Sequence, residues 1–153
     1  MPFNDTYANQ LLDWTLGQRA VTLSQFSEVY IGLSTNDPEA DGGVFEEFEG
    51  DTYERILIAK TNASYPDCIG NAANRSIQNT KQINWTKATV NWAADTGING
   101  FGLFTSKTGG EPYFYGKLDD VLRVAAGSVA LFDPGALKIS FPTSDAAAAA
   151  VSD

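Results

Sequence analysis

The stretch between Ile98 and Leu118 constrains the fold of this chain more than any other part of it. It consists of two aromatic-rich runs whose residues alternate between opposite faces, joined by a loop that contains Gly109 and Gly110. Alternation with a period of two indicates β-strands. Because glycine adopts the positive φ angles of tight turns at low cost, two such runs with a glycine pair between them predict a β-hairpin. We expect this hairpin to be the centre of an all-β domain.

Other parts of the chain also show strand patterns, with turn residues between them. These patterns lie at residues 28–35, 53–60, 128–132 and 136–141, with shorter strands near Ile77 and within 81–94. Together with the hairpin they make about eight short strands, which is typical of a single-domain antiparallel β-sandwich or jelly roll. The apolar residues expected in the core are Val29, Ile31, Leu33, Ile56, Ile58, Phe101, Leu103, Leu137 and Ile139.

One short helix is expected before the strands, at about residues 6–17. Its apolar stripe consists of Tyr7, Leu11 and Trp14, with Asp5 or Thr6 as the cap and Gly17 as the end. The helix should pack on a sheet or on a partner, because its charges are acidic and membrane-surface helices are usually rich in lysine. We expect the β-sandwich domain to span residues 1–141 and a flexible C-terminal tail to span residues 142–153.

Charge and composition exclude several classes of function. The chain carries a net charge of −9, no histidine and a single cysteine, Cys68, which we expect to be a small, partly buried residue. Nucleic acid and anionic membranes are poor partners, because binding to phosphate needs clustered Lys and Arg. Without histidine, a catalytic thiol lacks its usual base and most transition-metal sites lack their usual ligand. We therefore expect no catalytic residue, no metal and no cofactor.

No secretory signal or membrane-spanning stretch is visible in the sequence, so we expect a soluble protein that is made in the cytoplasm.

Residues 36–51 form a loop rich in acidic residues. The spacing of Asp37, Glu39 and Asp41 is similar to the start of an EF-hand calcium loop, but Phe48 stands where that loop requires glutamate. A looser calcium site built from the three acids stays open as an alternative. The simpler interpretation is a solvated turn.

Three further patterns admit a functional interpretation. Glu46 and Glu49 could form the carboxylate pair of a glycosidase, although acids so dense on a loop are mostly solvated. Trp85 and Trp92 could stack on sugar or base rings, although packing in a core or an interface is the more common fate of tryptophan. Residues 95–97 read Asp-Thr-Gly, as in aspartic proteases, but the chain has no second copy to complete a carboxylate dyad.

Several segments carry a resemblance when they are taken in order along the chain. They are NQLLD at 9–13, VYIGLSTNDP at 29–38, GDTYER at 50–55, residues 84–85, FGLFTSKTGG at 101–110, YGKL at 115–118 and residues 126–139. This order resembles a group of small bacteriophage virion proteins, which are often labelled tail fibre proteins. Related β-sandwich proteins serve as capsid decoration or cement subunits. The resemblance implies an all-β fold and a structural role in the virion, and it carries no catalytic residues over to this chain.

Two virion roles follow from the resemblance. The first is a capsid decoration protein on the outer head surface, bound to the major capsid protein or other virion proteins. It suits a compact chain without collagen-like or coiled-coil repeats, and the symmetry of shells favours a homo-oligomer, in particular a trimer. The alternative is a tail fibre or baseplate module that contacts the host surface. This alternative predicts an exposed aromatic cluster that binds a cell-surface glycan, built from Trp85, Trp92, Tyr113 and Tyr115.

A third hypothesis is an enzyme such as a wall or polysaccharide hydrolase. It requires a cleft with two facing carboxylates. The absence of histidine and of a strong acid pair on the predicted strands weighs against it.

Overall fold

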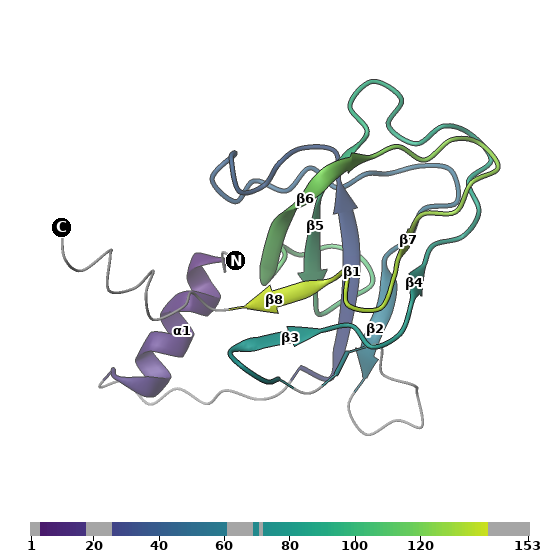
Figure 1. Cartoon of the computed structure of the whole chain (residues 1–153). Coiled ribbons are helices and arrows are strands. Elements are labelled where there is room, and N and C mark those ends of the chain that lie inside the picture. The colour runs from purple at the N-terminus through teal and green to yellow at the C-terminus, as the bar shows by residue number, and fades with distance from the viewer. Residues whose placement is uncertain (1–3, 18–25, 61–68, 71, 141–153) are drawn as a thin grey trace.

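The computed structural model describes residues 4–17, 26–60, 69–70 and 72–140, which form one helix and eight strands. In chain order they are α1 (Asp5–Thr15), β1 (Glu28–Ser34), β2 (Ile56–Lys60), β3 (Ser76–Gln78), β4 (Ile83–Asn84), β5 (Ile98–Phe104), β6 (Phe114–Leu122), β7 (Leu131–Phe132) and β8 (Lys138–Ser140). All strand pairs are antiparallel (Figure 1). The predicted all-β antiparallel class with one short N-terminal helix is confirmed.

The largest sheet has four strands in the order β2-β1-β5-β6. The predicted hairpin is confirmed, since β5 and β6 pair with Leu103 opposite Phe114 and Gly102 opposite Tyr115. β5 pairs on its other edge with β1, which places Leu33 opposite Phe101. The hairpin therefore contributes one inner strand and one edge strand of this sheet.

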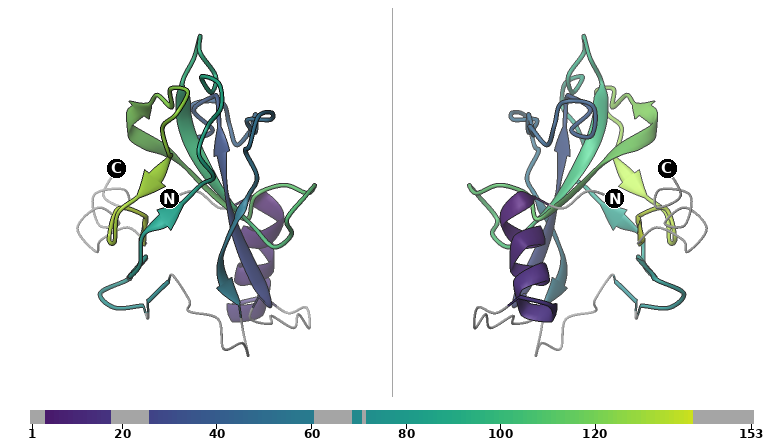
Figure 2. Two further views of the ribbon diagram at one scale, coloured as in Figure 1. Left: turned by 90° about the vertical axis from the view of Figure 1, so that its right-hand side faces the viewer. Right: turned by 90° about the vertical axis from the view of Figure 1, so that its left-hand side faces the viewer.

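Two short ribbons, β3–β8 and β4–β7, form a second layer. Figure 2 shows the four-stranded sheet between this layer and helix α1, so the ribbons cover one face and the helix lies toward the other. The strands of the second layer are shorter than predicted, because residues 85–97 and 123–130 form irregular segments, turns and the single bridge of Trp92 with Val124. Two layers around one core fit the β-sandwich, and the jelly roll stays a prediction.

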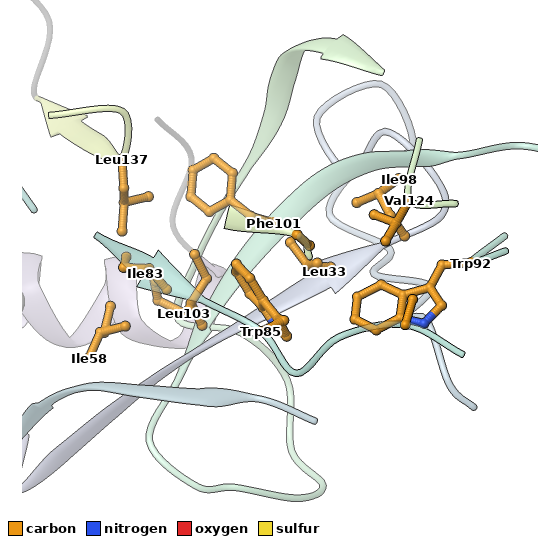
Figure 3. Close-up of a cluster of buried hydrophobic side chains, with 13 residues drawn as sticks. Leu33, Ile58, Ile83, Trp85, Trp92, Ile98, Phe101, Leu103, Val124 and Leu137 are labelled. Carbon is orange, nitrogen blue, oxygen red and sulfur yellow. The ribbon is translucent and has the colours of Figure 1, made fainter. Parts of the chain in front are cut away.

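The hydrophobic core lies between the sheet and the ribbons (Figure 3). Six of the predicted core residues are buried there: Ile31, Leu33, Ile58, Phe101, Leu103 and Leu137. The other three, Val29, Ile56 and Ile139, are partly buried and pack against this core. Trp85 and Trp92 are 3% and 1% exposed, so both tryptophans belong to the core and neither can stack on a sugar or a base. Trp85 packs edge-on against Phe132, with 5.5 Å between ring centroids.

The second face of the sheet is also covered, which the alternation in β1 did not predict. Gly32 and Ser34 point away from the core, yet both are buried. Residues 36–51, which we call the covering loop, fold back onto this face. At Gly100 a Cβ atom would lie 2.5 Å from Cδ of Pro38, so only glycine lets the covering loop approach so closely. The prediction that this loop is a solvated turn holds for residues 39–42 and 49–51, which are exposed, but not for Pro38, which is buried, or for Glu47 and Phe48, which are half-buried.

Helix α1 begins one residue earlier than the predicted caps allow. Asn4 is the N-cap, and its side chain accepts a 2.8 Å hydrogen bond from the backbone N–H of Tyr7. Asn4 also donates to the carbonyl oxygens of Pro112 and Tyr113, so one residue both caps the helix and ties it to the hairpin. Gly17 follows the helix, and its N–H bonds back to carbonyl oxygens of the last turn, as predicted.

Two expectations lie outside the described residues. Cys68 and the predicted tail at 142–153 are both in this part of the chain. The domain boundary at residue 141 stays a prediction for the same reason.

We predict that Gly100→Ala destabilises the fold by about 1–3 kcal/mol, because the added methyl group overpacks the contact between the sheet and the covering loop. Urea unfolding measures this change in free energy. Combining Gly100→Ala with Pro38→Ala should recover only part of the loss, since it removes the Cδ atom but leaves Oγ of Ser34, which also lies 2.5 Å from the added methyl group. Equal stability of Gly100→Ala and the parent chain would contradict the proposed close approach.

Candidate functional site

A buried ion pair holds the covering loop in place. The side chain of Arg55 is 4% exposed and that of Glu47 is 21% exposed, and they form two parallel hydrogen bonds of 2.8 and 2.7 Å. Arg55 also donates to the carbonyl oxygens of Ser106 and Gly109 in the turn between β5 and β6. Its guanidinium carbon lies 3.4 Å from the centroid of the Phe104 ring. One cation thus joins the covering loop, the hairpin turn and the sheet.

Tyr53 extends this buried polar cluster to β1. Its hydroxyl donates to Glu47 and accepts a 2.8 Å hydrogen bond from the backbone N–H of Leu33. Burial is the main reason that the pKa of Tyr53 is raised above its usual value, and the nearby Glu47 charge raises it further. The group stays a neutral hydroxyl, and its role is to satisfy backbone and carboxylate groups.

Asp51 organises the opposite end of the covering loop. Its φ angle of 48° is in the left-handed region, which aspartate tolerates in turns. Its carboxylate accepts hydrogen bonds from the side chain and backbone of Thr89, from the backbone of Val90 and from the indole N–H of Trp92. The hydrogen bond from the Thr89 side chain is the main reason that the pKa of Asp51 lies well below its usual range. This exposed carboxylate therefore acts as a clamp on residues 89–92.

The acids of the proposed calcium site serve the backbone of the covering loop instead. Asp37 accepts hydrogen bonds from the backbone N–H groups of Glu39 and Ala40, and Asp41 accepts one from the side chain of Asn36. Among the described residues, no group of three or more His, Cys, Asp or Glu side chains is placed to hold a metal ion. The calcium alternative therefore has no geometric support in this loop.

The exposed aromatic cluster predicted for a glycan site is not formed. Trp85 and Trp92 are in the core, Tyr115 is buried, and Tyr113 packs against Tyr7 with 5.3 Å between ring centroids. Of the four residues only Tyr113 is partly exposed. The prediction of this sugar platform is wrong because alternation alone does not show which face a second layer covers.

The exposed apolar residues of α1 form the strongest candidate for an interaction surface. Leu12 and Trp14 are 58% and 57% exposed, and Leu16, the C-cap residue, is 84% exposed; these three side chains stand around the C-terminal end of the helix, and we call them together the outer face of α1. The helix has no fully buried residue and is held through Asn4 and Tyr7, whose ring packs on Tyr113 and Phe114. Leu12 and Leu16 are about one helical turn apart, whereas Trp14 is two residues from each and lies on the other side of the helix. Large apolar residues that are exposed mark sites of contact with other proteins.

The helix lies where the sequence predicts it. Its stripe of Tyr7, Leu11 and Trp14 is expected to pack on a sheet or on a partner; in the structure Tyr7 and Leu11 are half-buried and Trp14 is exposed. The signal that could have found the outer face was the excess of apolar residues: with Leu12 and Leu16 added, the helix has more large apolar residues than one stripe can hold.

No helix in the described part of the chain is long and apolar enough to cross a membrane. The sequence matches the family described as podophage GP4 fiber I protein gp80 over residues 2–140. The chain belongs to this family. The chain is therefore a bacteriophage virion structural protein of fibre type, and the resemblance seen in its ordered segments is confirmed. A comparison with curated proteins gives no match.

Family membership also gives the residues above their context. The Arg55 cluster and the Asp51 clamp are both placed in the GDTYER segment, which had carried part of the resemblance. Their roles in this structure are architectural.

We predict that Arg55→Met lowers the free energy of unfolding by about 3 kcal/mol. This is the lower end of the range for removing one partner of a buried ion pair, because the Glu47 side chain keeps some contact with water. Urea unfolding measures the change. Arg55→Met combined with Glu47→Gln should be more stable than Arg55→Met alone, because no unpaired charge remains and the amide oxygen can still accept from Tyr53. A loss of less than about 0.5 kcal/mol in Arg55→Met would show that the pair does not hold the covering loop.

The lowered pKa of Asp51 predicts an acid-sensitive contribution to stability. The contribution is present above the usual aspartate pKa of about 4 and is lost as the pH falls toward the lower folded-state pKa. Asp51→Asn should therefore be less stable than the parent chain at pH 7, and the two unfolding midpoints should converge as the pH falls below about 4. Asp120→Asn, which changes an exposed carboxylate on β6, is the matched control. A constant difference between Asp51→Asn and the parent chain over pH 2–7 would contradict this role.

Proposed function

We propose that the protein is a small fibre subunit of a phage tail, attached to its neighbours through the outer face of α1. The observation that carries this proposal is the match to a podophage fibre protein over residues 2–140, nearly the whole described chain. The proposed role needs no catalytic group, and it makes protein–protein contact the main activity of the chain.

The composition of α1 supports a particular kind of neighbour. The described helix carries Asp5 and Asp13 and no Lys or Arg, and the whole chain has a net charge of −9. The apolar part of a neighbouring surface would match Leu12, Trp14 and Leu16, and a basic rim around it would match the negative charge of this chain. Tryptophan is enriched among the residues that contribute most to protein–protein binding, so Trp14 is the expected centre of this contact.

A capsid decoration protein on the outer head surface is the second candidate. The compact two-layer fold favours it, because the described chain has neither the coiled coil nor the repeats that build a long fibre shaft. In this role the neighbour would be the major capsid protein, and closed symmetry would favour a homo-trimer at a three-fold position. Both candidates place the chain in the virion and differ in which surface it occupies.

We predict a low copy number in purified virions, measured by quantitative mass spectrometry against the major capsid protein. On the order of a few to a few tens of copies, as multiples of the tail symmetry, would support the fibre role. Hundreds of copies would place the chain on the head and favour the decoration role. Absence from purified virions would contradict both candidates.

A further inference from the structure

A cleft of about 600 Å³ lies at the end of the molecule where α1 begins. Its walls are residues 4–6 at the start of the helix, residues 42–45 of the covering loop and residues 110–112 of the hairpin turn. Phe104 and Tyr115 of the main sheet also line it. This volume is in the range of clefts that bind small molecules or short peptide segments. The cleft is separate from the outer face of α1, whose apolar residues do not line it.

Tyr115 places a polar group in this cleft. The residue is 9% exposed, and its side chain lies on the face of the sheet that carries Gly102. Its hydroxyl oxygen lies only 2.9 Å from where a Cβ atom of Gly43 would be, so it reaches the wall formed by the covering loop. Within the described residues, this hydroxyl has no hydrogen-bond partner, and it is not fully buried, so its oxygen is accessible from the cleft. An accessible hydroxyl oxygen can accept a hydrogen bond from a polar group that enters the cleft.

The charges around the cleft are negative. Asp5 and Glu111 line it, and no Lys or Arg is among its lining residues. Glu47 also lines it, but Arg55 and Tyr53 already hold that carboxylate. The pKa of Tyr115 is raised by burial first and then by the charges of Asp5 and Glu39, which shows that the hydroxyl lies in a negative field.

The N-terminus of a helix usually favours a bound anion, but in α1 the chain's own Asn4 and Asp5 already take the place of that anion. The Asn4 side chain occupies the N–H of Tyr7, and Asp5 in the first turn supplies the negative charge that the helix dipole favours. An anionic ligand would meet Asp5 and Glu111 as well. A cation would be attracted instead, because the carboxylates of Asp5 and Glu111 and the hydroxyl oxygen of Tyr115 can accept its hydrogen bonds.

We propose that this cleft binds an arginine or lysine side chain on an extended segment of a neighbouring virion protein. The Tyr115 hydroxyl accepts one hydrogen bond from the cation, and the carboxylates of Asp5 and Glu111 pair with its charge. A second copy of this chain is the weaker occupant, because the net charge of −9 on each copy opposes their approach. Only the identity of the neighbour rests on the proposed function; the preference for a cation rests on the cleft itself.

The test is an NMR titration of the full-length ¹⁵N-labelled chain with the peptide acetyl-Gly-Arg-Gly-amide. We expect saturable shifts that centre on residues 4–6, 42–45 and 110–115. The same peptide with citrulline in place of arginine has nearly the same shape without the charge, and it should bind at least about tenfold more weakly. N-acetylglucosamine and inorganic phosphate are the probes for a sugar and for an anion.

Two variants connect the binding to the named groups. Tyr115→Phe and Glu111→Gln should each weaken the arginine peptide by about tenfold, since each removes one hydrogen bond or charge to a cation. Glu54→Gln is the matched control, because Glu54 is an exposed carboxylate that pairs with Lys107 outside this cleft. Unfolding midpoints near that of the parent chain show that the variants are folded.

Several results would overturn the proposal. They are equal binding of the arginine and citrulline peptides, shifts outside the cleft, no binding at all, or preferential binding of the sugar or of phosphate. Any of these would leave the proposed fibre role intact, because that role is tested by the copy number in virions. A copy number of zero would in turn leave the measured preference of the cleft for a cation unchanged.

Discussion

The pairing of Arg55 with Glu47 is the interaction on which the rest of this structure depends. It joins the covering loop to the turn of the β5–β6 hairpin. A buried charge is tolerated only when it is paired and fully hydrogen-bonded, and Arg55 meets this condition through a carboxylate, two carbonyl oxygens and an aromatic ring. The covering loop in turn buries the second face of the sheet and forms one wall of the cleft beside α1.

The strands of this protein could be predicted from its sequence because their signal is local. Ile31, Leu33, Phe101 and Leu103 repeat with a period of two, and each is buried where that period places it. The hairpin could be predicted from Gly109 and Gly110 because the preference of glycine for tight turns is also a local signal. The short strands of the second layer were overestimated, since the residues between β4 and β5 use side-chain bonds such as those of Asp51 in place of a ladder.

The covering of the second face could not be predicted, because it depends on contacts between residues that are far apart in the chain. The sequence does not show why Gly32, Gly100 and Gly102 are glycines, whereas in the structure their lack of a side chain is what admits the covering loop. The sequence predicts that the acidic residues of that loop are solvated, yet Glu47 pairs with Arg55, eight positions later in the chain. The cleft depends on Tyr115 and on three segments that only the fold brings together, so no sequence pattern pointed to it.

These features divide the molecule into a closed body and two surfaces that are suited to contact neighbours, the outer face of α1 and the cleft. A cryo-electron-microscopy reconstruction of the virion at side-chain resolution tests this account most directly. We expect density for a neighbouring protein over Leu12, Trp14 and Leu16, with the covering loop still packed on the sheet. A virion in which α1 faces solvent and the ribbons β3–β8 and β4–β7 form the contact would contradict the account.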